Sequence, residues 1–274
     1  ALPEGFSIEN GHYPWYNRKK KGEIAMKEQL HTAAVNEAFS AGDECPFCYL
    51  QRQAEQRVIR FVAGPSASYM EPEIREITNQ TGFCPAHLKK LYDYGNTLGN
   101  ALMLQTYFAR QLDRLRDEIE HFDAPAPKKL FSRPQASQDG CWKRIQQDVQ
   151  CCYICDRLEN NMDRYYHTFF ALLKEEEFRS RVENSKGFCM RHFSELLHMA
   201  EEKLPNAQHQ WFYDTVFSLM EENLNRVKKD LDWLVSMYDY RNASADWKNS
   251  RDALQRTMQK LGGGYVADKP YRLD

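Results

Sequence analysis

The chain has 274 residues, 42% of them apolar, and a formal net charge of −2. This size suits one large or two small globular domains, and the near-neutral charge gives no general attraction to nucleic acid or anionic membranes. No apolar run reaches the roughly 18 residues of a transmembrane helix, and residues 1–15 lack the pattern of a signal peptide. We therefore expect a cytoplasmic protein that binds neither nucleic acid nor membrane.

The first part of the chain predicts an irregular arm followed by a helical unit. Residues 1–22 are rich in proline and glycine and predict the arm. Residues 23–122 predict the unit, with helices over 23–39, 45–62 and 71–81 and a long helical pattern from 85 to about 122. The apolar residues of this long pattern keep helical spacing and predict a buried stripe, formed by Ala101, Leu104, Phe108, Leu112, Leu115 and Ile119.

A proline-rich segment over residues 123–140 predicts a linker. Residues 141–245 then repeat the order of helices that precedes the linker. Moving 105 residues along the chain takes Phe108 to Tyr213 and Leu112 to Phe217, so apolar positions of the two long patterns coincide. Residues 246–274 predict a last short helix and a mobile tail. No run alternates as a strand would, and we expect an all-α fold of two tandem similar units.

Each predicted unit carries the same cysteine and histidine motif. The first motif is Cys45-x-x-Cys48 followed by Gly82-Phe83-Cys84-x-x-His87, and the second is Cys152-x-x-Cys155 followed by Gly187-Phe188-Cys189-x-x-His192. Both pairs of each motif fall at predicted helix starts, where residues three apart share one face. The positive end of a helix also favours a thiolate over a thiol.

Three thiolates and one imidazole form the tetrahedral set typical of structural zinc. We therefore predict two zinc ions per chain, one within each unit. The predicted ligands are Cys45, Cys48, Cys84 and His87 in the first unit and Cys152, Cys155, Cys189 and His192 in the second. An iron–sulfur cluster is the alternative, because thiolates with a histidine can also hold one. Each motif leaves 33 or 35 residues between its two pairs, whereas ordinary zinc fingers leave about 12 to 20.

Other interpretations of these residues are buried thiols beside core histidines, and redox pairs. A redox pair leaves the downstream Cys-x-x-His unexplained. Four ligands per site predict a closed structural ion, because a catalytic zinc keeps a position open for water. The sequence contains no phosphate loop, Gly-x-Ser-x-Gly or Rossmann fingerprint, so we predict no catalytic and no cofactor-binding residues. Cys141 and Cys151 lie outside both motifs.

At these motifs the chain resembles a family of uncharacterised bacterial cytoplasmic proteins that carry the same duplicated unit. The resemblance covers about residues 25–240 and includes all eight predicted ligand positions. It implies metal binding and no particular activity.

Two classes of function follow from the sequence. One is a non-catalytic helical scaffold, held by zinc, that binds a protein partner or a small ligand. The other is an enzyme or a thiol-based sensor that uses a metal-bound thiolate. The closed ligand sets favour the scaffold, and a deep pocket that reaches a metal would favour the second class.

Overall fold

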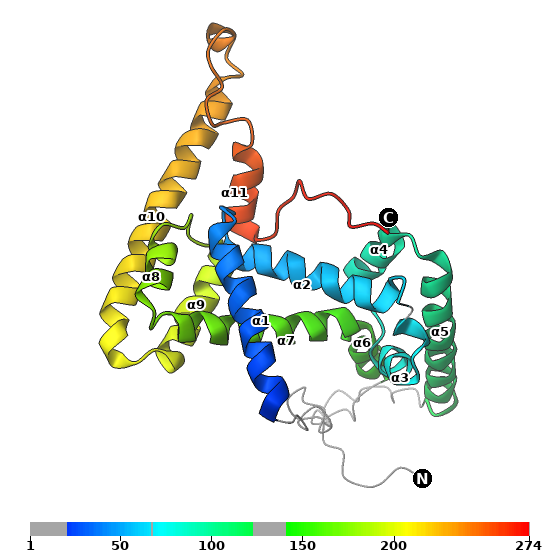
Figure 1. Cartoon of the computed structure of the whole chain (residues 1–274). Helices are drawn as coiled ribbons and strands as arrows, with labels where there is room; N and C mark the ends of the chain where they lie inside the picture. The colour runs from blue at the N-terminus through cyan, green and yellow to red at the C-terminus, as the bar shows by residue number, and fades with distance from the viewer. Residues whose placement is uncertain (1–20, 67, 123–140, 274) are drawn as a thin grey trace, which may run out of the picture.

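The structure is a computed structural model that describes residues 21–66, 68–122 and 141–273. Within these residues the regular secondary structure is entirely helical, which confirms the all-α prediction (Figure 1). The predicted linker at 123–140 and residues 1–20 of the predicted arm lie outside the described residues. Among the described helices, none is both long enough and apolar enough to cross a lipid bilayer.

The described helices follow the predicted order in both halves of the chain. The first half contains α1 (Lys21–Ser40), α2 (Pro46–Ala63), the short helix η2 (Ser68–Met70), α3 (Pro72–Thr81), α4 (Pro85–Tyr94) and α5 (Thr97–Glu120). The second half contains α6 (Cys141–Gln150), α7 (Tyr153–Leu172), α8 (Glu176–Glu183), α9 (Met190–Lys203) and α10 (Asn206–Ser236). The chain ends with η3 (Tyr240–Asn242) and α11 (Ala253–Gly262). A tandem duplication and the domain boundaries stay predictions.

Each long helical pattern is divided into two helices. Gly95 adopts a left-handed conformation after α4, and the Asn96 side chain accepts a hydrogen bond from the Gly99 amide to begin α5. In the second half, Leu204 and Pro205 have extended conformations between α9 and α10. The chain therefore turns shortly after each Cys-x-x-His pair.

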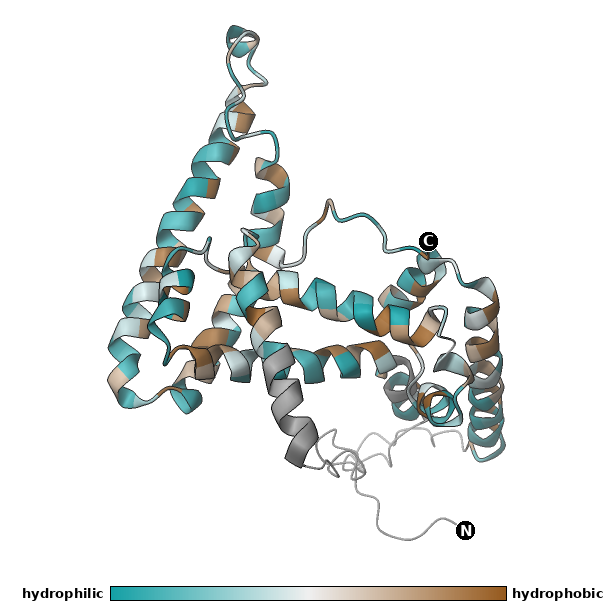
Figure 2. Cartoon of the chain, viewed as in Figure 1, coloured by the Kyte–Doolittle hydropathy of each residue, from teal (hydrophilic) through white to brown (hydrophobic). Residues whose placement is uncertain are grey.

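Helices α2 and α7 pack against each other and connect two hydrophobic cores. The larger core joins α1 and the first part of α2 to α7, α8, α9 and α10, and it is built around aromatic rings such as Phe47, Phe169 and Phe188. The smaller core joins the end of α2 to α3, α4 and the first turn of α7. The start of α2 therefore lies at the end of α7, and the two helices run antiparallel. Figure 2 shows brown, apolar turns on α2, α7 and α9, and mainly teal, polar turns on α10.

The stripe predicted on α5 is not buried, which corrects the expectation from periodicity. Phe108 is 71% exposed and Ile119 is 66% exposed, whereas only Gly99 and Met103 of α5 are buried. The reason is that α5 packs chiefly on the short helix α3 through a face that includes Thr106 and Arg110. Phe108 lies on another face, and Ile119 lies beyond α3. In the second half, Met220 is buried but Phe217 is 50% exposed, so the matched positions differ in environment.

The last part of the chain packs against both halves, unlike the mobile tail that the sequence indicated. Helix α11 lies against α10 and α9. The tail then runs across α2 to α4 (Figure 1), where the Leu273 amide donates to the Tyr94 carbonyl at 2.8 Å. Arg52 on α2 forms an ion pair with Asp268 of the tail at 2.9 Å.

Candidate metal centres

The eight predicted ligands converge in two clusters. We call Cys45, Cys48, Cys189 and His192 the A cluster, and Cys84, His87, Cys152 and Cys155 the B cluster. In each cluster the candidate ligand atoms lie within 4.8 Å of one another. Two Cys₃His clusters are therefore confirmed, but their composition differs from the prediction. Each cluster takes one pair from the first half of the chain and one pair from the second.

The antiparallel packing of α2 on α7 explains this exchange. Each helix carries its cysteine pair at its first turn, and an 18- to 20-residue helix is about 30 Å long. The two cysteine pairs therefore lie at opposite ends of the α2–α7 layer. After α2 the chain stays near the far end of that helix, where α7 begins, and places α4 beside the start of α7. The Tyr153 amide donates to the Gly82 carbonyl at 3.0 Å across this junction.

All four ligand pairs occupy the same two positions of a helix. The first cysteine of each pair is the N-cap residue, with an extended backbone, and the second ligand is the third residue of the helix. In the A cluster the Cys45 sulfur accepts from the Cys48 amide at 3.4 Å, and the Cys189 sulfur accepts from the His192 amide at 3.5 Å. Helix capping therefore orients both sulfurs before any metal is bound.

The glycine of each Gly-Phe-Cys motif has a positive φ, of 61° at Gly82 and 72° at Gly187. Gly82 combines this φ with a ψ of −152°, a region that is essentially restricted to glycine. A Cβ atom at Gly82 would also lie 2.2 Å from the Tyr107 ring. Helix α8 ends at Glu183 with Asn184 as its C-cap, so Gly187 lies in the loop after the helix. The motif glycines thus turn the chain into the ligand-bearing helices.

The separations between ligand atoms fit the edges of a small tetrahedron. In the A cluster the Cys48 and Cys189 sulfurs are 3.7 Å apart, and the sulfurs lie 3.2 to 3.5 Å from the His192 Nδ1. In the B cluster the Cys84 and Cys155 sulfurs are 3.8 Å apart, and the sulfurs lie 3.2 to 3.3 Å from the His87 Nδ1. Each cluster can therefore present all four donor atoms to a single ion.

The two clusters differ in exposure. All four A residues are buried, and the sulfurs of the A cluster belong to the larger aromatic core. In the B cluster His87 and Cys152 are buried, Cys84 is half-buried and Cys155 is exposed. The B cluster therefore contains one exposed and one half-buried cysteine, whereas every ligand residue of the A cluster is buried.

The histidines also differ in what holds the second ring nitrogen. The His87 Nε2 lies 3.0 Å from a carboxylate oxygen of Glu55 on α2, and Lys90 pairs with the other oxygen at 2.5 Å. A carboxylate in this position fixes the ring and raises the basicity of the ligating nitrogen. The buried Nε2 of His192 has no hydrogen-bond partner among the residues that the structure describes. Glu55 lies seven residues after Cys48 on α2. The corresponding position on α7, seven residues after Cys155, is Met162, which has no carboxylate.

Without a metal, hydrogen bonds with Cys45 and Cys48 lower the pKa of Cys189 and make it the favoured thiolate of the A cluster. Burial raises the pKa of Cys45 well above its ordinary value, and hydrogen bonding with Cys189 raises the pKa of Cys48 to about 12. Burial alone would lower the pKa of His87 and raise that of Cys152. The hydrogen bond between these two groups outweighs burial, so the pKa of His87 rises to about 10 and that of Cys152 falls to about 6. A bound ion must displace protons from both clusters.

The C-terminal segment, residues 246–273, covers the A cluster. The buried Lys260 of α11 donates to the Glu44 carbonyl at 2.6 Å and the Lys186 carbonyl at 2.5 Å, and so joins the two loops that lead to Cys45 and Cys189. Just beyond, a Cβ atom on Gly263 would lie within 3.8 Å of the Cys48 and Cys189 sulfurs. The Gly264 backbone hydrogen-bonds the Cys48 sulfur.

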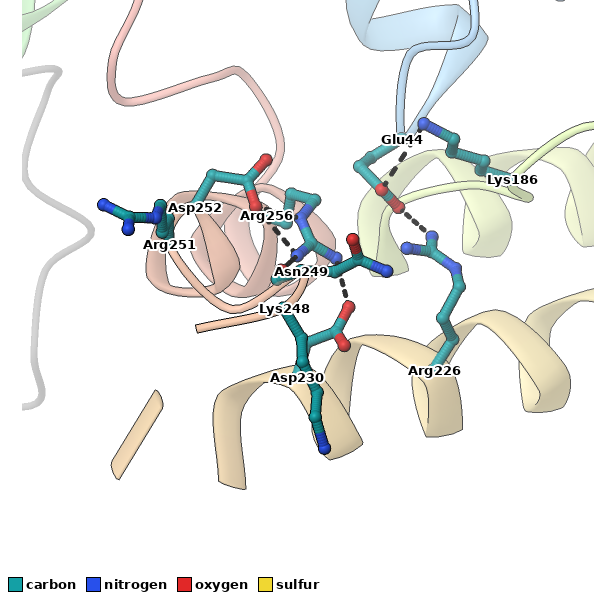
Figure 3. A pocket seen from close by; sticks show the side chains of 9 residues that line it. All are labelled: Glu44, Lys186, Arg226, Asp230, Lys248, Asn249, Arg251, Asp252 and Arg256. Carbon is teal, nitrogen blue, oxygen red and sulfur yellow. Dashed lines mark hydrogen bonds and ion pairs between the residues drawn. The ribbon is translucent and has the colours of Figure 1, made fainter. Parts of the chain in front are cut away.

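A charged pocket of about 410 Å³ lies next to the loops that lead to Cys45 and Cys189 (Figure 3). Arg226 of α10 pairs there with the buried Glu44 at 2.5 Å. Arg256 of α11 pairs with Asp230 at 2.9 Å and with Asp252 at 2.8 Å. The Arg256–Asp230 pair attaches α11 to α10, and the Arg226–Glu44 pair attaches α10 to the loop before Cys45. They explain why the C-terminal segment holds its place over the A cluster.

Cys151 is exposed and belongs to neither cluster, and Cys141 is the first residue of α6, with its side chain outside the described part of the molecule. Sequence reasoning missed two residues that support the clusters. Glu55 shares a face of α2 with Cys48, but Cys48 belongs to the A cluster and Glu55 contacts His87 of the B cluster, so the spacing alone would have assigned it to the wrong cluster. Lys260 gave no sequence signal, since its role depends on where α11 packs.

Comparison with known proteins supports the resemblance noted from the motifs. Residues 26–268 match the model of a family described as "Family of unknown function (DUF6062)". The chain is also 20% identical over 202 residues to the "Uncharacterized 23.9 kDa protein in xynA 3'region" of Caldicellulosiruptor sp. (strain Rt8B.4), which covers 73% of this chain and 85% of that protein. No solved structure matches the chain. With nearly its whole length matched, the chain belongs to the DUF6062 family of unknown function.

Proposed function

We propose that each cluster binds one zinc ion, and that the two ions cross-link the two halves of a non-catalytic helical scaffold. The observation that carries the proposal is the exchange of ligand pairs. Each cluster joins two helix starts from different halves of the chain. An ion at either position fixes the first half against the second, which a site within one unit would not do.

Ligand geometry favours a single zinc ion over an iron–sulfur cluster. With zinc–sulfur bonds of about 2.3 Å and zinc–nitrogen bonds of about 2.0 Å, a tetrahedral site has edges of about 3.8 Å between sulfurs and about 3.6 Å between sulfur and nitrogen. The separations of 3.7 and 3.8 Å between sulfurs match the first value. The separations of 3.2 to 3.5 Å between sulfur and nitrogen are slightly shorter than the second. An iron–sulfur cluster distributes its ligands over several irons and therefore requires wider spacing.

Ligand number favours a structural role. Four protein ligands complete a tetrahedral zinc site and leave no position for water or substrate. In the A cluster, burial and the C-terminal segment add a second barrier to any substrate. The free energy of binding zinc then adds to the free energy of folding.

A scaffold needs surfaces for a protein partner or a small ligand, and two features are candidates. A groove of about 630 Å³ lies between α2, α4 and the tail, and its lining includes Arg52, Lys90 and Tyr265. The groove extends to Cys48 of the A cluster, whose side chain is nevertheless fully buried. The exposed apolar side chains of α5, including Phe108 and Ile119, form a second surface. The groove depends on the placement of the C-terminal tail against the first half, whereas the α5 surface is formed within the first half.

The test is metal content combined with thermal melting of the full chain. Protein prepared without oxygen should contain about two equivalents of zinc, and a chelator should remove the zinc and lower the melting temperature. Cys189→Ser should lose zinc and melt earlier, and Cys151→Ser, which alters a cysteine outside both clusters, should do neither. Less than one equivalent of any metal would contradict metal binding. Full thermal stability after zinc removal would contradict the structural role.

A further inference from the structure

We propose that the B cluster is a thiol-modification site for hydroperoxides: oxidation joins Cys84 to Cys155 and releases the zinc ion of the B cluster, while the A cluster keeps its ion. This inference rests on the proposed function, because it requires zinc in both clusters. The structural basis is the unequal exposure of two clusters with the same ligand types.

The reactive group is the Cys155 thiolate. A cysteine bound to a metal is deprotonated, and a thiolate reacts with oxidants only where it is accessible. Cys155 is exposed, whereas its counterpart in the A cluster, Cys48, is fully buried. The Gly263–Gly264 backbone also lies over the Cys48 sulfur. Access to solvent therefore separates two otherwise equivalent cysteines.

The second thiol is already close to the first. The Cys84 sulfur lies 3.8 Å from the Cys155 sulfur and is itself half-buried, so it can follow Cys155 in a second step. The two cysteines come from different helices, α4 and α7. Their oxidation therefore replaces a metal cross-link between the halves with a covalent one.

The chemistry balances with a hydroperoxide as the oxidant. The Cys155 thiolate attacks the O–O bond, taking up one oxygen as a sulfenic acid, and the other oxygen leaves with a proton as an alcohol, or as water from hydrogen peroxide. The Cys84 thiolate then attacks the sulfenic sulfur, forms the disulfide, and expels hydroxide, which takes a proton to become water. Two thiolates lose two electrons and the peroxide gains them.

Loss of two thiolates leaves only Cys152 and His87 in the B cluster. Two ligands are fewer than the three that even an open zinc site uses, so the ion is released as Zn²⁺. Reduction of the disulfide by a dithiol restores both thiolates and allows zinc to bind again. The modification is therefore reversible.

The experiment treats zinc-loaded full-length protein with hydrogen peroxide in the presence of a colorimetric zinc chelator. We expect release of about one of the two zinc equivalents, together with a Cys84–Cys155 disulfide in the peptide map. Dithiothreitol followed by zinc should restore the starting content. The unchanged protein should also react with iodoacetamide at Cys155 before Cys48, a comparison that needs no variant to fold.

Two variants sharpen the result. Cys151→Ser removes the neighbouring exposed cysteine and should release zinc as the parent does; dependence on Cys151 would overturn the assignment. Cys155→Ser should form no disulfide with Cys84. Equal release from both clusters, or no release from either, would refute this inference and leave the structural proposal standing. Protein that never contains zinc would instead refute the structural proposal.

Discussion

Replacing Cys48 together with Cys189 by serine removes two ligands from the A cluster and none from the B cluster. Replacing Cys48 together with Cys84 removes one ligand from each cluster. If the ligands were paired within each half, as the sequence suggested, the two double variants would exchange roles. Zinc retention by these proteins therefore tests the exchanged pairing directly.

The expected magnitudes follow from the ligand counts. The Cys48/Cys189 variant leaves two ligands in the A cluster, too few for zinc, and an intact B cluster, so it should keep about one tightly bound equivalent. The Cys48/Cys84 variant leaves three ligands in each cluster. Loss of a residue that only hydrogen-bonds a ligand weakens metal binding by about 10- to 100-fold. Loss of a thiolate ligand itself should therefore weaken zinc binding in both clusters by at least about 100-fold. This factor corresponds to roughly 2.7 kcal/mol per site.

The assay titrates each zinc-loaded variant with a competing chelator and measures the zinc that remains. We expect one equivalent with the affinity of the parent B cluster in the Cys48/Cys189 variant, and no equivalent of parental affinity in the Cys48/Cys84 variant. Cys151→Ser serves as the control and should keep both. The exchanged pairing is wrong if the Cys48/Cys84 variant retains one tight equivalent while the Cys48/Cys189 variant retains none.

Four further outcomes are expected. Glu55→Gln should weaken zinc binding in the B cluster by about 10- to 100-fold, measured by chelator competition, with the A cluster unchanged as the internal control. Lys260→Met leaves two buried carbonyls without their donor and should lower the free energy of unfolding in urea by about 3 kcal/mol; an unchanged value would contradict its structural role. Gly82→Ala forces a Cβ against Tyr107 and should cost more than about 2 kcal/mol in the same assay. The pKa of His87 is raised to about 10 without metal, so its proton must leave when zinc binds. Zinc affinity should therefore rise by about tenfold per pH unit for each proton displaced. Competition titrations at a series of pH values would measure this rise.

The helix starts and the ligand set could be predicted from the sequence because both depend on short-range chemistry. A cysteine before a helix acts as an N-cap, and proline at positions 46 and 85 suits the first helical turn. The second ligand then falls three residues later on the same face. The positions of the N-cap cysteine and of the second ligand do not depend on where the rest of the chain lies. In the structure both are found where the motifs predicted them.

The pairing of the clusters could not be predicted, because the same four pairs satisfy either arrangement locally. The direction of α7 against α2 decides it, and that direction follows from packing around Phe47 and Phe169. The prediction that the apolar stripe of α5 is buried was wrong for a related reason. Periodicity identifies the apolar face of a helix but not the element that covers it. Thr106 and Arg110 contact α3, so Phe108 lies on another face of α5, and Ile119 lies beyond the end of α3.

The exchanged pairing also sets an order of events during synthesis of the chain. Cys84 and Cys155 are 71 residues apart, and this interval lies entirely inside the 141 residues that separate Cys48 from Cys189. At ribosomal rates of about 5–20 residues per second, the first cysteine pair waits roughly 7 to 30 seconds for its partners. During that wait the nearest available pair is Cys84 and His87, the wrong one. Correct assembly therefore requires that α7 docks on α2 before a metal ion joins the two early pairs, or that an ion bound by these pairs is released afterwards.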